Sequence, residues 1–256
     1  FPSAPGAQVG QVWFNTVSAT LKGHAATGTG SWASGGNLNT GRSSTGSAGT
    51  HAAALLFGGN PPVSANTESY DGSTWTELND LQNSALDVAG LGISTAALCV
   101  GGEDPTLTAK CEQWDGTNWT EVNDLNTASF GKSGAGITSA GLVYGGAEPA
   151  HTVNTESWDG TSWTEVNNMN VAKRSSGGCG TQASAIVCGG ETPPGGTLTA
   201  DSESWNGTSW SEENNCNTAR YNQAASGTSS SYAMIYGGAA PLVGTESFNG
   251  TSWTEL

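Results

Sequence analysis

The chain has 256 residues, a net charge of −15 at pH 7 and 38 glycines, and only 11% of its residues are charged. With seven Lys and Arg against 22 Asp and Glu, it lacks the basic clusters that bind a nucleic-acid backbone or an anionic lipid surface. No apolar run approaches the length of a membrane span. Composition therefore disfavours nucleic acid as a partner and insertion into a membrane. Because the chain begins at Phe1 rather than Met, we expect a segment upstream of it.

Residues 1–38 do not share the repeat that fills the rest of the chain. They contain two strand-like runs, VWFN at 12–15 and TLKGH at 20–24, and a Gly-Ser-Trp sequence that ends at Trp32. We expect a strand-containing N-terminal extension here. It could complete the following fold as a partial unit, cap that fold, or join it to another part of a longer protein.

From residue 39 onward, a short phrase with two aromatic positions recurs five times. The first copy, TESYDGSTWTEL, occupies 67–78, and the last, TESFNGTSWTEL, occupies 245–256. A Gly-Gly pair that ends an apolar run keeps the same period, which identifies a repeat architecture. A disordered chain has no reason to keep both signals in phase. The second aromatic residue of the five copies is Trp75, Trp119, Trp163, Trp210 and Trp253.

Each repeat is predicted to form four short antiparallel strands. A glycine-rich strand comes first, and the apolar run that ends in Gly-Gly comes second. The third and fourth strands flank an Asp-Gly or Asn-Gly turn, a strong hairpin signal because glycine tolerates the positive φ of such turns. Four strands at this period are the unit of a β-propeller blade, whereas a parallel β-solenoid, the competing geometry, has no tight hairpin in each unit. We therefore predict an all-β propeller of five four-stranded blades at about 39–79, 80–123, 124–167, 168–214 and 215–256, with residues 1–38 as a possible degenerate sixth.

The Gly-Gly pair after an apolar strand, followed by an aromatic residue and then by Trp after a short turn, resembles the kelch repeat of β-propellers. The resemblance covers residues 39–256 and implies a propeller, but it leaves function open because kelch propellers include enzymes, scaffolds and adhesins. Copper oxidases of the galactose-oxidase type have a kelch-like propeller and use two His, two Tyr and a Cys crosslinked to one Tyr. This chain shows no such set in matching repeats, so oxidase activity is not carried over. The Trp columns are predicted to pack between blades rather than to serve as sugar-stacking platforms.

The N-terminal extension has a resemblance of its own. Its WFNT run at 13–16, followed by LK at 21–22, is similar to segments of structural and tail-fibre proteins of tailed bacteriophages. This resemblance implies a virion-associated protein.

Thirteen of the 22 acidic residues fall into three columns of the repeat. We expect these columns to lie at outward or turn positions, where the Asp of each Asp-Gly turn hydrogen-bonds the turn backbone. Calcium binding would need converging carboxylates, and no EF-hand or D-x-D spacing is present. The columns are Glu68, Glu112, Glu156, Glu203 and Glu246, then Asp71, Asp115 and Asp159, and then Glu77, Glu121, Glu165, Glu212 and Glu255.

The five cysteines form no C-x-x-C pair, which argues against zinc. We predict five small buried thiols, with cross-strand disulfides between Cys179 and Cys188 or between Cys99 and Cys111 as the alternative. The three histidines occupy unrelated places in the repeat, which predicts exposed loop residues rather than metal ligands or general bases. They are His24, His51 and His151.

Arg42, Lys173 and Arg220 share one column of the repeat, in which two other blades have Ala85 and Ser129. At one rim of the central channel these cations could bind an anionic sugar. Sialidases clamp a carboxylate with three arginines, and this chain has three, Arg42, Arg174 and Arg220. The alternative is that they pair with neighbouring glutamates at strand ends, and we favour it. SYDGSTW at 69–75 resembles a sialidase Asp-box, but its Asp directly precedes Gly, so the spacing fails.

The longest and least repetitive loops all follow Gly-Gly, so they are predicted to emerge on one face of the propeller. Prolines stiffen them, and diverse stiff loops on a regular scaffold are typical of a recognition surface. The candidate binding residues in these loops are Pro61, Pro62, Asp104, Pro105, Glu148, His151, Glu191, Pro193, Pro194 and Pro241.

These observations favour a non-enzymatic structural and recognition module without a metal or cofactor. We expect it to be extracellular or virion-associated, as a phage surface or tail component that contacts other virion proteins and displays its loops to a host protein or glycan. The alternatives are a glycan-cleaving propeller enzyme, a cellular kelch scaffold that binds a protein partner, and a secreted lectin.

Overall fold

The computed structural model describes residues 12–15, 20–23, 32, 34–239 and 244–256. The chain divides into two compact units, Phe1–Ser34 and Gly35–Leu256. In the first unit, β1 (Val12–Asn15) pairs antiparallel with β2 (Thr20–Gly23). Most of the expected partial blade over 1–38 lies outside the described residues. Among the described residues there is no helix, and hence none that could cross a membrane.

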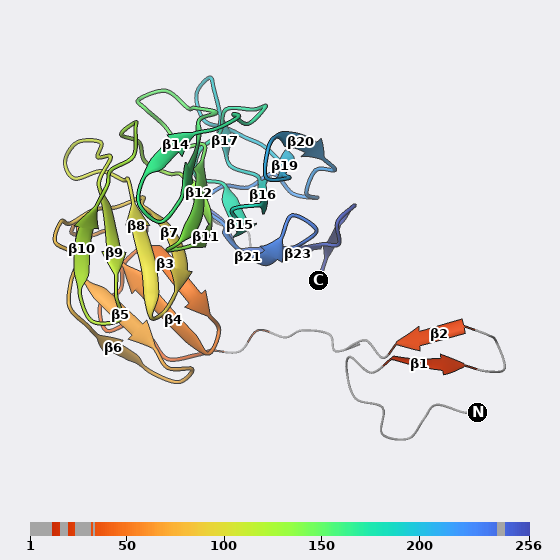
Figure 1. The fold of residues 1–256 in the computed structure, drawn as a ribbon, viewed down its shortest axis with the longest axis horizontal. Coiled ribbons are helices and arrows are strands. Elements are labelled where there is room, and N and C mark those ends of the chain that lie inside the picture. The colour runs from red at the N-terminus through yellow and green to blue at the C-terminus, as the bar shows by residue number, and fades with distance from the viewer. Residues whose placement is uncertain (1–11, 16–19, 24–31, 33, 240–243) are drawn as a thin grey trace. The chain divides into compact units, whose positions relative to one another are not determined.

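The second unit is a five-bladed β-propeller of four-stranded antiparallel sheets, as predicted (Figure 1). Each blade pairs its strands in chain order, so the register follows from the two hairpins and the loop between them. A short extra hairpin, β17 (Glu191–Thr192) with β18 (Thr197–Leu198), decorates the fourth blade. The first blade consists of β3 (Gly46–Thr50), β4 (Ala53–Phe57), β5 (Thr67–Tyr70) and β6 (Trp75–Glu77), and the second of β7 (Ala89–Ile93), β8 (Ala96–Val100), β9 (Cys111–Trp114) and β10 (Trp119–Val122). The third consists of β11 (Ser133–Ile137), β12 (Ala140–Tyr144), β13 (Thr155–Trp158) and β14 (Trp163–Glu165), and the fourth of β15 (Gly177–Thr181), β16 (Ser184–Cys188), β19 (Ser202–Trp205) and β20 (Trp210–Glu213). The last consists of β21 (Ala224–Ser229), β22 (Tyr232–Tyr236), β23 (Thr245–Phe248) and β24 (Trp253–Glu255).

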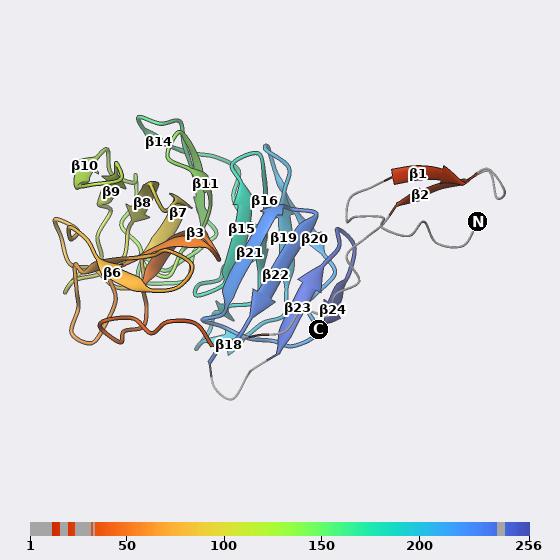
Figure 2. The same cartoon turned by 90° about the horizontal axis from the view of Figure 1, so that it is seen from below.

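The first strand of each blade lies nearest the axis, and Figure 2 shows the last blade, β21 to β24, as one sheet with β21 innermost. The inner strands β3, β7, β11, β15 and β21 line a central cavity of about 560 Å³. Their glycines are needed because the neighbouring inner strand is so close. A Cβ at Gly90 would lie 2.3 Å from the carbonyl oxygen of Ser47 in the preceding inner strand, and one at Gly178 would lie 2.7 Å from the Cβ of Ser133 on β11. Only a residue without a side chain fits there.

Aromatic side chains fill the gaps between blades, as the repeat predicts. Trp119 of the second blade packs edge-on against Phe57 of the first, with ring centroids 4.8 Å apart. Its indole Nε1 donates a 2.9 Å hydrogen bond to the buried Thr67 hydroxyl of that first blade. The same bond recurs from Trp210 to Thr155 at 3.0 Å. Trp119 and Trp210 therefore each contribute apolar burial and a satisfied polar contact to one blade–blade interface.

A chain of backbone hydrogen bonds also links the blades around the axis. The amide of Asp87 donates to the carbonyl of Ser44, Gly131 donates to Asp87, Ser175 to Gly131, and Asn222 to Ser175, at 2.8–2.9 Å. All five residues have a positive φ between 52° and 64°. Gly, Asn and Asp are the residues that adopt this conformation most readily, whereas Ser44 and Ser175 adopt it at an energetic cost. Among the described residues, no hydrogen bond closes the chain between Ser44 and Asn222.

Among the described residues, no blade packs on one face of the first blade or on one face of the last blade, and we call these the uncovered faces. Leu142 on β12 faces the next blade and Val143 faces the preceding one, and both are fully buried at 0% exposure. Met234 of the last blade is the equivalent of Leu142, and Leu56 of the first is the equivalent of Val143, yet both are only half-buried. Trp75 is half-buried too, whereas its four equivalents are 3–6% exposed. Inner strands β3, β7, β11, β15 and β21 pack in succession, and no comparable packing joins the described strands β21 and β3.

Candidate ligand-binding site on the loop face

One face of the propeller carries both the loop between the second and third strands of each blade and the linkers between blades. We call it the loop face. Backbone hydrogen bonds hold the two kinds of segment together, as from Gly59 to the carbonyl of Ala85 and from Gly102 to that of Ser129, at 2.8 and 2.9 Å. Of the predicted binding residues in these loops, Pro241 lies outside the described residues. Pro61, Pro62, Asp104, Pro105, Pro193 and Pro194 are exposed, and Glu148, His151 and Glu191 are half-buried.

The first acidic column was expected on an outward position, and that expectation is wrong. Glu68, Glu112, Glu156, Glu203 and Glu246 are buried, with 0–4% exposure. Each carboxylate turns inward because it accepts backbone hydrogen bonds from the linker that enters its blade. Glu246, for example, accepts from the amides of Asn217 and Thr218 at 2.6 and 3.2 Å. The column is thus a repeated clamp that fixes each linker on the loop face.

In the last blade, Arg220 completes this clamp. Its Nη2 donates a 2.7 Å bond to the Glu246 carboxylate, and its Nη1 donates to the carbonyls of Gly244 and Gly237 at 2.7 and 3.2 Å. Its Nε donates to the carbonyl of Thr218 at 3.3 Å. Arg220 is 2% exposed, so one carboxylate and three carbonyls surround a buried guanidinium.

The other two basic residues of this column occupy the same position in their blades. Arg42 pairs with Glu68 at 2.5 Å and contacts the carbonyl of Asn66, the equivalent of Gly244. Burial raises the pKa of Glu68, but hydrogen bonds from Asn39 and from Arg42, together with the Arg42 charge, hold it below its ordinary value. Lys173 pairs with Glu203 at 3.3 Å, and both side chains are 0% exposed. The three cations are therefore buried in ion pairs with strand-end glutamates rather than presented at the channel rim.

The third blade has Ser129 in this column, and another lysine lies near its glutamate. The buried Lys132 donates from Nζ to the carbonyl of Gly145, the equivalent of Gly237, at 3.1 Å. Burial lowers the pKa of Lys132, and the negative charge of Glu156 opposes that effect. One oxygen of Glu156, Oε1, is buried without a hydrogen-bond partner.

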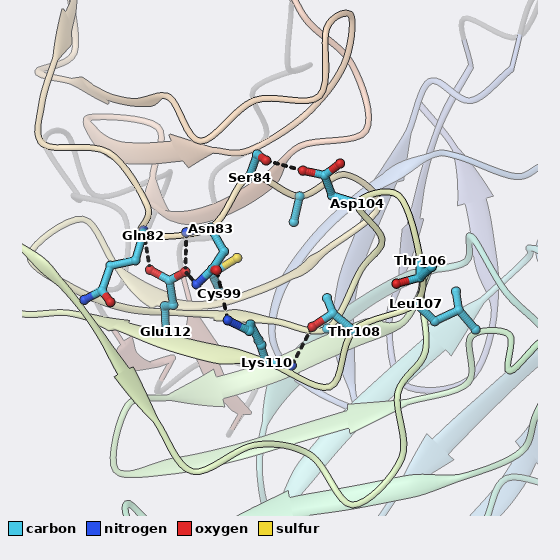
Figure 3. Close-up of a pocket in the computed structure, with 12 residues that line it drawn as sticks. Gln82, Asn83, Ser84, Cys99, Asp104, Thr106, Leu107, Thr108, Lys110 and Glu112 are labelled. Carbon is cyan, nitrogen blue, oxygen red and sulfur yellow. Dashed lines mark hydrogen bonds between the residues drawn. The ribbon is translucent and has the colours of Figure 1, made fainter.

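The second blade has Ala85 in this column, and a cavity of about 400 Å³ lies beside it (Figure 3). Glu112 closes one side of the cavity and accepts hydrogen bonds from the amides of Gln82 and Asn83 at 2.8 and 3.0 Å. Within the described part of the chain Glu112 makes no ion pair, and the residue is buried at 4% exposure. We call this cavity the Glu112 pocket; its lining is Gln82, Asn83, Ser84, Ala85, Cys99, Gly101, Asp104, Thr106, Leu107, Thr108, Lys110 and Glu112.

Three charged side chains line the Glu112 pocket. Lys110 donates from Nζ to the Asn83 side-chain oxygen at 2.9 Å and pairs with Glu121 outside the pocket at 3.3 Å. The Lys110 side chain is 43% exposed, so its charge lies toward solvent. On the opposite side, the exposed Asp104 accepts a hydrogen bond from the Ser84 hydroxyl. Glu112 and Asp104 together outweigh Lys110, which leaves the lining negatively charged.

The other two acidic columns lie where they were expected. Glu77, Glu121, Glu165, Glu212 and Glu255 are exposed on the outermost strands. Asp71 accepts bonds at 2.8 Å from the amides of Ser73 and Thr74 in its turn. These bonds lower the pKa of Asp71, and the equivalent bonds do the same for Asp115 and Asp159. Asn206 and Asn249 make the same contacts in the last two blades.

The cysteines and histidines add no cluster to the site. All five cysteines are buried free thiols, and neither possible disulfide forms, since Cys179 lies opposite Ile186 and Cys99 opposite Glu112. Burial raises the pKa of Cys99, which lines the Glu112 pocket, well above its ordinary value. His51 is exposed as predicted, His151 is half-buried, and His24 lies outside the described residues. No group of three potential metal ligands occurs in the part of the chain that the structure describes.

The sequence predicted one loop residue of the Glu112 pocket as a binding residue but did not predict Glu112 itself. The loop residues Asp104 and Pro105 were predicted from their position after Gly-Gly, and Asp104 lines the pocket. Glu112 was missed because its column was interpreted as solvent-exposed. The signal that could have found it is Ala85, a small residue in a column that otherwise has Arg or Lys in three of five blades.

Comparison of the chain with protein-family models gives no match, and comparison with curated proteins gives none either.

Proposed function

We propose that this propeller is a non-enzymatic recognition module that binds its ligand on the loop face. The observation that carries the proposal is the Glu112 pocket, a cavity of about 400 Å³ within the size range of small-ligand sites. It lies between a linker and a loop that differs in sequence from its counterparts in the other blades. The hydrogen-bonded clamps around it are repeated, so a fixed scaffold supports a variable surface.

We further propose that the module is related to kelch propellers and belongs to a virion or to another extracellular surface. The order of Gly-Gly, aromatic residue and Trp in each repeat supports the first part. The phage-like WFNT and LK runs of the N-terminal extension support the second, together with the acidic, lysine-poor composition. On this proposal, the partners are other virion proteins and a protein or glycan of a host surface.

Binding arrays with the purified protein test the recognition function. The chain is applied to a glycan array and to a panel of host surface proteins, alongside two variants. Thr106→Trp places a large ring at the pocket, and Thr95→Trp places the same ring in an exposed hairpin turn of the same blade on the opposite face. We expect a ligand whose binding is lost in Thr106→Trp and kept in Thr95→Trp. Equal binding by both variants, or no ligand at all, would count against the loop face.

The virion assignment needs a separate measurement. Purified virions should contain the chain at a fixed stoichiometry, and genes for portal, capsid or tail proteins should lie beside its gene. Absence from virions, or metabolic and signalling neighbours, would favour a cellular scaffold or a secreted lectin.

The glycan-cleaving alternative makes a different prediction. It needs accessible catalytic groups, yet Arg42 and Arg220 of the three arginines compared with a sialidase clamp are buried against glutamates. The third, Arg174, is half-buried and pairs with Glu191 at 3.0 Å. Incubation with a broad glycan panel decides between the two functions. Reproducible release of a product would overturn the non-enzymatic proposal.

A further inference from the structure

We propose that the Glu112 pocket binds a guanidinium group, such as that of an arginine side chain on the ligand. This inference rests on the proposed function, because it names the chemistry that the loop face would recognise. It comes from a comparison of equivalent positions in the second and last blades.

In the last blade, four acceptors hold the guanidinium of Arg220: the carboxylate of Glu246 and the carbonyls of Gly244, Gly237 and Thr218. The repeat gives each acceptor an equivalent in the second blade. They are the carboxylate of Glu112 and the backbone carbonyls of Lys110, Gly101 and Asn83, in the same order.

All four equivalents line the Glu112 pocket, and Ala85, the equivalent of Arg220, lines it too. The cavity therefore lies where the arginine side chain lies in the last blade. The residues that line it are held by the same kinds of hydrogen bond as their equivalents in the other blades. Glu112 is held by the two linker amides and by the Asn83 side chain, whose Nδ2 donates to Oε1 at 3.1 Å. Gly101 donates to the carbonyl of Lys110 at 2.9 Å. A ligand would meet acceptors that are already positioned, and its guanidinium would share Oε1 of Glu112 with the Asn83 side chain.

The charges around the pocket suit a cation. A buried carboxylate without an ion pair is stabilised most by a cationic partner that also donates hydrogen bonds to it. Asp104 adds a second negative charge on the other side of the cavity, and Lys110, the positive group nearest Glu112 in the lining, directs its ammonium to Asn83 and Glu121.

The geometry favours guanidinium over ammonium. Arg220 reaches its four acceptors at 2.7–3.3 Å. Lys173, in the same column, reaches only Glu203 at 3.3 Å and the carbonyl of Asp201 at 3.5 Å. A planar fork of donors matches this arrangement better than a point charge does. The cavity also has room for the aliphatic part of an arginine side chain, at about 400 Å³.

The direct test is titration of the whole chain with N-acetyl-arginine amide, followed by NMR or calorimetry. N-acetyl-citrulline amide, a neutral analogue of the same shape, is the control ligand, and N-acetyl-lysine amide compares an ammonium. We expect the arginine compound to bind about tenfold or more tightly than the citrulline compound, because its hydrogen bonds are charge-assisted. The lysine compound should fall between them. Equal affinity for arginine and citrulline would overturn the inference.

Two variants locate the binding. Ala85→Arg supplies the guanidinium from within the chain, as Arg220 does, and should abolish binding while the fold is kept. Thr95→Arg adds the same side chain to an exposed turn on the opposite face and should leave binding unchanged. Retention of binding in Ala85→Arg would place the ligand elsewhere and reject the pocket.

Ala85→Arg and Thr106→Trp together distinguish failure of this inference from failure of the proposed function. A host ligand that is lost in Thr106→Trp but kept in Ala85→Arg would support the loop face and reject the guanidinium site. A ligand lost in both variants, with binding of the arginine compound to the unmodified chain, supports both.

Discussion

The four interfaces between successive blades and the two uncovered faces at the ends of the series are built from the same columns of the repeat, yet their environments differ. Leu142 and Val143 are fully buried between neighbours, whereas Met234 and Leu56, in the same two columns, are half-buried. A side chain in this protein is thus buried by the neighbouring blade rather than by its own sheet. The repeat predicts which residues face a neighbour, and the position of the blade in the series determines whether that neighbour is present.

Removal of an inter-blade tryptophan should distinguish the two regions most strongly. Trp210→Ala deletes a ring that is 6% exposed and also leaves the Thr155 hydroxyl without its donor. We expect a loss of about 3–5 kcal/mol in the free energy of unfolding, measured with denaturant. Trp75→Ala at the uncovered face of the first blade should cost less than half as much. Similar losses for both variants would show that the first blade is covered in solution.

The apolar column of the second strand gives a finer comparison. Leu142→Ala removes a side chain of 0% exposure and should destabilise the protein by about 2–5 kcal/mol. Met234→Ala acts in the same column at the half-buried face of the last blade and should destabilise it by a smaller amount. Both substitutions leave the backbone pairing of the strand unchanged and delete side chains of similar size, so the covering blade is the main difference between them. A larger loss for Met234→Ala would contradict the comparison.

A single hydrogen bond within an interface should have a smaller effect. Thr155→Val keeps the shape of the side chain but removes the acceptor of the Trp210 indole, which leaves a buried donor unsatisfied. We expect a loss of about 1–3 kcal/mol, measured by chemical denaturation. The Trp163 indole of the third blade is a useful reference, because it lies against the Cys111 thiol and its buried Nε1 has no hydrogen-bond partner among the residues that the structure describes. Cys111→Ala therefore removes no hydrogen bond from the Trp163 indole, and its loss in the free energy of unfolding should contain no hydrogen-bond contribution of the kind that Thr155→Val has.

The smallest effect concerns amide exchange around the axis. The amides of Asp87, Gly131, Ser175 and Asn222 each donate to the preceding blade, whereas no hydrogen bond joins Ser44 to Asn222 among the described residues. Native-state hydrogen exchange should therefore show slower exchange at those four amides than at Ser44. Equal protection of Ser44 would mean that the series of blades is closed at this point.

Much of the fold could be predicted from the sequence because two independent signals share one period. The Gly-Gly pair fixes the end of the second strand, and the Asp-Gly or Asn-Gly turn fixes the hairpin that follows. The inner glycines also follow from the repeat, since a Cβ at Gly90 or Gly178 would collide with the neighbouring blade. The uncovered faces could not be predicted, because a local pattern carries no information about the first and last members of a series.

The candidate site could be predicted only in part, for a physical reason. A glutamate in a strand next to a turn usually faces water, and hydrophobic patterning gives no sign that Glu112 or Glu246 turns inward. The backbone amides that draw these carboxylates inward come from a linker about 30 residues earlier in the chain, so no local pattern links the two segments. The basic column did predict that Arg42, Lys173 and Arg220 pair with strand-end glutamates, since each blade that has a basic residue in this column also has a glutamate in the first acidic column.

The positive-φ residues around the axis have a consequence for how the sequence can change over time. Their contacts to neighbouring blades are made by the backbone amide and carbonyl, so selection acts on a conformation and not on a side chain. The five equivalent positions are occupied by Ser, Asp, Gly, Ser and Asn, so four residue types already meet the requirement for a positive φ. A β-branched residue is the change least tolerated there. Two propellers of this kind could therefore share the same axial hydrogen bonds while the alignment of their sequences shows no identity at these positions.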